Sequence, residues 1–207
     1  MKTPDLVFRG RRLSSDRALV LAAIEVLPEP AAVRDAVRAA VADGADLVSF
    51  AGAGAEPLVE WARETFPGLF VGIDTADPSV AAACCEAGAD LIIARADLAG
   101  VAARFGAGYA ASSVPADAGL PVSGTVLDVG VLRTALPEGV PVPAEGFPVL
   151  VEVAGDGTPA GLARAALAAS AGVAIIRTRH VREVRHVAEM AASIAGTRPP
   201  AKAVRWE

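Results

Sequence analysis

Short runs of β-branched and other apolar residues recur along the chain and alternate with longer alanine-rich stretches. Each run has the length of one strand, and residues pointing to both sides of it are apolar. Such runs are typical of parallel strands that are covered on both faces. The predicted strands span residues 19–26, 46–52, 69–75, 90–95, 108–113, 124–130, 148–155 and 173–179.

The stretches between these runs have the composition of helices, and several end in glycine just after the last apolar residue. Three of them share an ending, "ADGADLV", "CEAGADLI" and "SAGVAII", in which a buried strand begins almost directly after the glycine. This rhythm predicts repeated β-α units. The predicted helices span residues 30–44, 55–66, 77–88, 98–106, 158–172 and 181–196.

Eight parallel strands in 207 residues predict an α/β fold: a small closed (β/α)8 barrel of the TIM type, with residues 1–207 as a single domain. The chain is short for this fold because the crossovers after the fifth and sixth strands are shortened and rich in proline. The rival architecture is an open, doubly wound sheet. It is disfavoured because "EVLPEP" follows the first strand, where such sheets carry a glycine-rich phosphate turn.

Charge and composition narrow the range of partners. The formal net charge is −5, and no basic run with interleaved aromatic residues is present, so nucleic acid is not expected as a partner. The segment "MKTPDLVFRGRRLSS" carries charges where a signal or a membrane span would have to be apolar, so we predict no membrane contact and a cytoplasmic protein. Cys84 and Cys85 are adjacent in a helical stretch, which predicts core residues rather than a disulfide.

Polar residues at the ends of the predicted strands mark the candidate site, because the chemistry of (β/α)8 barrels takes place there. Four carboxylates lie in otherwise apolar runs, where a charge must be paired, hydrogen-bonded or hydrated, and we expect them to share one cavity. These are Glu25, Asp74, Asp128 and Glu152.

Two interpretations of these carboxylates remain open. They could pair with Arg95, Arg177 and Arg179 in a network that closes the barrel, or they could line a site for a small polar ligand. His180 and His186 lack the spacing of metal ligands, so no metal site is predicted from them, whereas binding of Mg²⁺ by carboxylates alone stays open.

Five segments along the chain carry a resemblance to a known family. They are, in order, "LVFRGRRLSSDRALVLAAIEVLPEP", "AVADGADLVSFAG", "GIDTADPSVAAACCEAGADLI", "IIRTRHVREVRHVAEMAASI" and "GTRPPAKAVR". Through them the chain resembles the dihydropteroate synthase family nearly end to end, with a gap in the middle, and most of all the divergent second paralog of actinobacteria. This resemblance implies a (β/α)8 barrel that joins a dihydropterin diphosphate to p-aminobenzoate in folate biosynthesis. In this family Mg²⁺ assists the loss of diphosphate.

The resemblance carries three substrate-binding residues over to this chain. Asp74 of "GIDT" matches the aspartate that binds the edge of the pterin, and Asp128 of "TVLDVG" matches a second pterin-binding aspartate. Arg177 matches the arginine that packs near the pterin and binds phosphate.

The departures from the family pattern are more numerous. The loop after the first strand begins at Glu25 instead of asparagine, and the Ser-Thr-Arg loop after the second strand is missing. Ile93 replaces an asparagine, Asp156 a lysine and Arg179 a histidine, with His180 displaced by one position. Glu152 stands where the family usually has glycine or alanine on the floor of the pocket.

These departures predict that synthase activity has been lost. Glu25 and Asp156 place negative charge where a diphosphate would bind, and each like-charge contact at ~4 Å costs roughly 4 kcal/mol before screening. We therefore expect a non-catalytic relative that partners another enzyme or binds a small molecule, as a homodimer or heteromer formed through its last helices. The alternatives are acid-base chemistry in a carboxylate-lined pocket and residual transferase activity.

Overall fold

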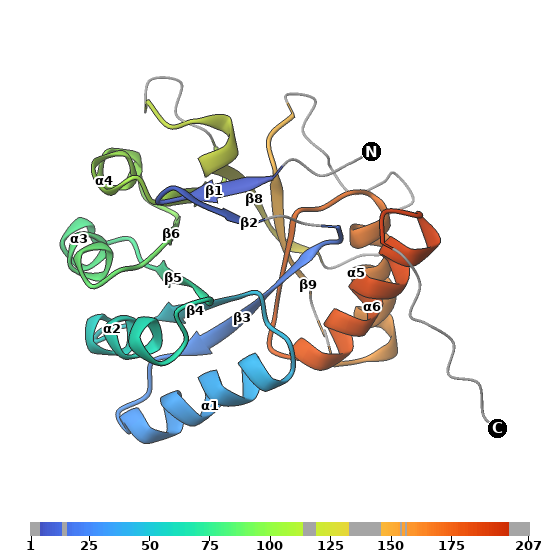
Figure 1. Cartoon of the computed structure of the whole chain (residues 1–207), viewed down its shortest axis with the longest axis horizontal. Helices are drawn as coiled ribbons and strands as arrows, with labels where there is room; N and C mark the ends of the chain where they lie inside the picture. Colours follow the sequence, from blue (N-terminus) through green and yellow to red (C-terminus); the bar gives the residue numbers. More distant parts are fainter. Residues whose placement is uncertain are drawn as a thin grey trace.

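The computed structural model describes residues 5–13, 16–113, 119–132, 146–153, 155 and 157–198. In these residues, eight parallel strands close into a barrel in the order β10-β3-β4-β5-β6-β7-β8-β9, and helices cover its outer face (Figure 1). The predicted (β/α)8 architecture is therefore confirmed. The strands are β3 (Leu19–Glu25), β4 (Leu47–Ala51), β5 (Phe70–Asp74), β6 (Leu91–Ala94), β7 (Gly108–Ala111), β8 (Thr125–Leu132), β9 (Val149–Val153) and β10 (Ile175–Thr178).

The helices also lie where the sequence predicts them, and three of them begin with proline, whose fixed φ angle suits the first turn. Asp77 and Thr158 cap two of these helices by accepting backbone hydrogen bonds, from Ser79 at 2.8 Å and from Gly161 at 3.1 Å. The helices are α1 (Pro30–Ala42), α2 (Glu56–Thr65), α3 (Pro78–Glu86), α4 (Ala99–Phe105), α5 (Pro159–Ser170) and α6 (Val181–Ile194).

The shortened crossovers are seen only in part. Between β7 and β8 the described residues form a single turn of 3-10 helix, η1 (Val122–Gly124), in place of a full helix. The crossover after β8 falls on residues 133–145, which lie outside the described residues.

The apolar core has two layers, because side chains alternate between the two faces of each strand. One layer packs between the sheet and the helices and contains Val48, Val71 and Ile176. The other fills the lumen of the barrel with Leu47, Phe70 and further large side chains. The lumen is therefore a packed core over most of its length.

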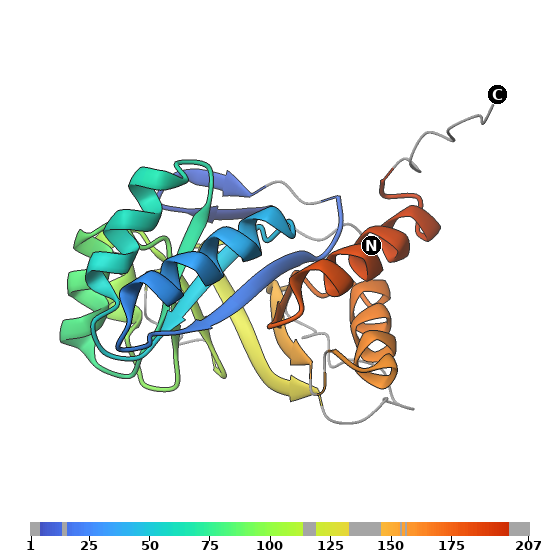
Figure 2. The same ribbon diagram turned by 90° about the horizontal axis from the view of Figure 1, so that it is seen from below.

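A two-stranded antiparallel hairpin, β1 (Leu6–Phe8) and β2 (Arg11–Leu13), precedes the barrel and was not predicted from the sequence. Its turn residues Arg9 and Gly10 both have positive φ angles, 50° and 72°, as in the tight two-residue turns of hairpins. Leu6, Phe8 and Leu13 join the lumen cluster. The hairpin thus closes the barrel at the end where the strands begin (Figure 2).

Aromatic packing holds this hairpin in place. The ring of Phe8 is fully buried, meets the ring of Phe70 edge-on at 6.3 Å and covers Gly108 at the start of β7. The guanidinium of Arg11 lies 4.1 Å above the Phe70 ring. A side chain at position 108 would occupy the space of the Phe8 ring, so the small residue is required there.

Two arginines of the hairpin add polar anchors. Arg9 donates to the backbone carbonyl of Cys85 at 2.6 Å, which fixes the strained turn. Arg11 lies 3.0 Å from the carboxylate of Asp90, and Arg63 of α2 lies 3.3 Å from the same group. Since the Asp90 side chain is only 1% exposed, the two arginines are what makes its burial tolerable.

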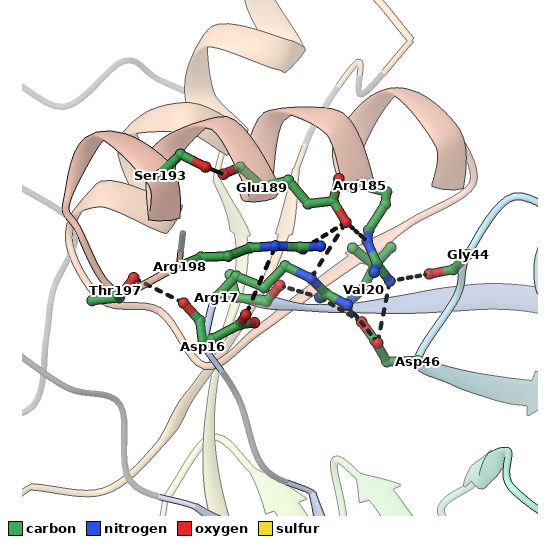
Figure 3. A network of polar contacts seen from close by, with 11 residues as sticks. Asp16, Arg17, Val20, Gly44, Asp46, Arg185, Glu189, Ser193, Thr197 and Arg198 are labelled. Carbon is green, nitrogen blue, oxygen red and sulfur yellow. Dashed lines mark hydrogen bonds and ion pairs between the residues drawn. The ribbon is translucent and has the colours of Figure 1, made fainter. Parts of the chain in front are cut away.

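A second network of charges joins the last helix to the first barrel strand (Figure 3). Arg17, just before β3, lies 2.7 Å from Asp46, just before β4. On α6, Glu189 accepts hydrogen bonds from Arg185 and from Arg198, each at 2.7 Å. Burial alone would raise the pKa of Glu189, but these two hydrogen bonds and the positive charges of the two arginines together lower the pKa below its usual value.

Cys84 and Cys85 are fully buried in α3, in agreement with the predicted core role. Burial raises the pKa of each thiol to about 11, so neither is a reactive thiolate near neutral pH.

Among the described helices, none combines the length and the apolar character that crossing a membrane requires.

Candidate functional site

The candidate site lies at the end of the barrel where the strands finish, and its central residue is Arg177 of β10. Its guanidinium lies 2.7 Å from the Asp74 carboxylate of β5, and its Nε atom lies 3.7 Å from the Glu152 carboxylate of β9. β5 is three strands away from β10 in the barrel order. The Arg177 side chain therefore crosses the lumen.

The alternation along the strands explains why these side chains point inward. On β10, Ile175 belongs to the lumen cluster and Ile176 to the outer cluster, so Arg177 faces the lumen again. On β9, Leu150 faces the lumen, and Glu152 follows it at the next inward position. The strand register and the alternation of side chains therefore bring Arg177, Asp74 and Glu152 to the same end of the barrel.

A second ion pair lies at the rim of the same opening. Arg179 holds Glu25 at 2.6 Å, but the two side chains are 70% and 66% exposed. Exposed pairs of this kind contribute at most about 1 kcal/mol. The expectation that four carboxylates share one cavity is therefore wrong for Glu25, which is paired in solvent.

A cavity of about 300 Å³ lies between β3, β9 and β10. Of the predicted site residues, Glu152, Arg177 and Arg179 line it. The remaining wall is made of small residues, among them Ala23 and Thr178, which carried no functional signal in the sequence. Position at a strand end was the only sign that could have indicated them.

The other predicted site residues lie apart from this cluster. Asp128 sits at an irregularity of β8 and accepts a hydrogen bond from the backbone of Gly130 at 2.8 Å. Ile93 is 2% exposed and belongs to the lumen core. Asp156 lies outside the described residues. Arg95, considered for the same network, is exposed and makes no ion pair with the residues that the structure describes.

The residues present do not suit a bound Mg²⁺ ion. Within the described ranges, no three histidine, cysteine, aspartate or glutamate side chains come together in a way that could hold a metal. At the opening, Asp74 and Glu152 face the cation of Arg177 instead. A hard cation needs several oxygen ligands at once, and this arrangement does not provide them.

Comparisons with known proteins point to one family, although no family model matches the chain. A Mycobacterium bovis protein called inactive dihydropteroate synthase 2 is 30% identical, over 95% of this chain and 89% of that protein. A Mycobacterium leprae protein of the same name is 29% identical, over 95% and 97%. The first alignment spans 289 positions, more than the 207 residues of this chain, so the relative contains segments that this chain lacks.

Solved structures agree with this result. The structure of Mycobacterium tuberculosis Rv1207 is 31% identical, with a TM-score of 0.77 and coverage of 95% of this chain and 99% of that one. A dihydropteroate synthase from Coxiella burnetii, in complex with pteroic acid, is 17% identical, with a TM-score of 0.77 and coverage of 94% and 99%. The second likeness is one of fold alone.

Proposed function

This chain belongs to the dihydropteroate synthase family, and we propose that it is a non-catalytic member that has lost synthase activity. One observation carries the proposal. Asp74 and Arg177, two of the three residues to which the resemblance assigns substrate binding, bind each other across the lumen at 2.7 Å. A substrate that bound these two groups would compete with their ion pair.

The electrostatics of the opening support the same conclusion. A diphosphate requires cations, yet Arg177 and Arg179 are each already held by a carboxylate, at 2.7 Å and 2.6 Å. Glu152 adds a further negative charge on the cavity wall. Near a protein surface, a like-charge contact at ~4 Å is unfavourable by roughly 4 kcal/mol before screening. The names of the mycobacterial relatives point the same way.

The test is a calorimetric titration of the folded protein with dihydropterin diphosphate and Mg²⁺, followed by an assay with p-aminobenzoate. We expect neither binding heat nor product. A catalytically active dihydropteroate synthase serves as the positive control, and a cooperative thermal transition shows that the protein is folded. A Glu152→Ala variant is measured in parallel. If this variant binds dihydropterin diphosphate, the Glu152 side chain blocks the ligand; if it does not, the lack of free cationic contacts prevents binding. Micromolar binding, or product formed by the unmodified protein, would contradict the proposal.

We also propose that the protein assembles as a homodimer through its last two helices. Met190 and Ile194 lie one turn apart on α6 and are 60% and 81% exposed, and Leu167 of the adjacent α5 is 51% exposed. Exposed apolar side chains on neighbouring elements are typical of protein interfaces. A second copy presents the same apolar face, as a twofold interface requires.

Replacing Ile194 with glutamate is expected to weaken this dimer at least tenfold, equivalent to about 1.4 kcal/mol, because it places an unpaired charge in an apolar contact. Molar mass measured by light scattering over a range of protein concentrations gives the readout. Val122→Glu is the matched control, because Val122 is an exposed apolar residue on η1, away from α6. A monomeric unmodified protein, or an equal effect of both variants, would rule out this interface.

We propose a cytoplasmic location for the protein. Two buried, adjacent free thiols, Cys84 and Cys85, suit a reducing compartment.

A further inference from the structure

A cavity lies beside Arg177, at the end of the barrel where the strands finish. Its volume is about 300 Å³, and its wall comes from β3, β9 and β10. At the ~30 Å³ that one water molecule occupies in the liquid, the space corresponds to about ten water-sized groups. A small organic molecule of similar size fits this space.

The charges around the opening favour a cation. The described ionisable groups that are paired there are three carboxylates, Glu25, Asp74 and Glu152, and two arginines, Arg177 and Arg179. The formal sum of their charges is −1. Arg177, the less exposed of the two arginines, is held by Asp74 at 2.7 Å, so an anion that bound it would compete with that carboxylate. A cation has no such competitor.

Glu152 is the acceptor that such a cation would meet. It lines the cavity and its side chain is 46% exposed. Its distance of 3.7 Å to Arg177 Nε is longer than a hydrogen bond, so this carboxylate keeps its capacity to accept hydrogen bonds from a ligand. A carboxylate binds a planar, forked N–H donor with two parallel hydrogen bonds, which is the strongest geometry that it can form.

Two buried polar groups point to a polar occupant as well. Among the described residues, neither the Nε atom of Arg177 nor the hydroxyl of Ser49 has a hydrogen-bond partner. Ser49 is fully buried, faces the lumen and lies beside Ala23, which lines the cavity. Buried polar groups are satisfied by protein, water or ligand, so these atoms require polar groups in the adjacent space.

We propose that the cavity binds a small organic cation of the amidinium class through Glu152, without turning it over. This inference rests on the proposed loss of synthase activity and specifies the ligand class of the same opening. The charge preference of the site is thereby reversed: a family pocket that receives a diphosphate anion has become one that receives a cation. The amidinium donates two parallel hydrogen bonds to the Glu152 carboxylate, and the rest of the molecule occupies the space between Ala23 and Thr178.

The test compares benzamidine, benzamide and benzoate, which share one ring and differ in the charge of one substituent. Binding to the full chain is followed by protein-detected NMR at low ionic strength. We expect saturable binding of benzamidine, at least tenfold tighter than that of benzamide, and no binding of benzoate. Glu152→Gln, which keeps the shape of the side chain, is expected to weaken benzamidine binding at least tenfold. Glu64→Gln, on the exposed face of α2, is the control and should leave it unchanged.

Three results would overturn the inference: benzoate binding as tightly as benzamidine, equal benzamidine affinity of the Glu152→Gln and unmodified proteins, or no binding of any of the three probes. The synthase assay is read separately. Product in that assay refutes the loss of activity, whereas failure of benzamidine to bind with no product formed refutes only the ligand class.

Discussion

Replacing Gly108 with alanine is expected to lower the free energy of unfolding by about 3 kcal/mol, the upper range for overpacking of a core. The added Cβ atom would lie 2.2 Å from Cδ1 and 2.4 Å from Cε1 of Phe8, well inside van der Waals contact. The Phe8 ring is fully buried and packed against Phe70, so it cannot move aside without displacing the hairpin. Urea unfolding followed by circular dichroism measures the change.

The matched control for this substitution is Gly100→Ala in α4. An added Cβ at Gly100 meets no atom within 4 Å, and alanine in a helix is favoured over glycine by roughly 0.5–1 kcal/mol. Gly100→Ala should therefore be neutral or stabilising. Adding Phe8→Leu to Gly108→Ala should recover part of the loss. If Gly108→Ala unfolds at the same urea concentration as the unmodified protein, Phe8 does not occupy this space in solution.

Removing the buried carboxylate of Asp90 should have a similar effect. Asp90→Ala is expected to destabilise the protein by about 3 kcal/mol, because it leaves two partly buried arginines and a buried backbone N–H without their partner. Arg11 and Arg63 both lie against this carboxylate, at 3.0 Å and 3.3 Å, and Val71 donates its backbone N–H to it at 3.0 Å. The variant should also release the hairpin, which limited proteolysis near Arg9 and Arg12 detects.

Asp35→Ala provides the comparison with an exposed ion pair. Asp35 lies 2.6 Å from Arg38 on α1, but its side chain is 73% exposed. A pair of this kind contributes at most about 0.5 kcal/mol. Similar losses for the Asp90 and Asp35 variants would show that burial of the Asp90 network is not what stabilises the hairpin.

The barrel was predictable because its signals are long and redundant. Strands such as β3 and β6 are largely continuous apolar runs, and a glycine or a proline marks the boundary of the neighbouring helix. The hairpin was not predicted, since strands of three residues carry little periodicity. Its turn is Arg-Gly, whereas Asn-Gly is the usual signal, and Arg9 is held at positive φ by distant carbonyl groups that no local pattern reveals.

The sequence predicted which residues lie at the candidate site, but not which carboxylate forms an ion pair with which arginine. Strand ends placed Asp74, Glu152 and Arg177 at one end of the barrel. The partner of Arg177 depends on how far apart β5 and β10 lie once the barrel closes, and on strand register. The same closure leaves Glu25 at the rim, paired with Arg179, although its sequence context resembles that of Asp74.

The network of charges between α6 and β3 limits the order in which a nascent chain can acquire its structure. β3 is the first barrel strand to be synthesised, yet its neighbour β10 and the α6 residues of this network are made near the end of translation. Arg185 and Asp46, for example, are 139 residues apart in sequence. Until then β3 keeps one edge unpaired, and such edges recruit chaperones or aggregate. Synthesis on the ribosome is therefore the stage at which this small barrel is most exposed to misassembly.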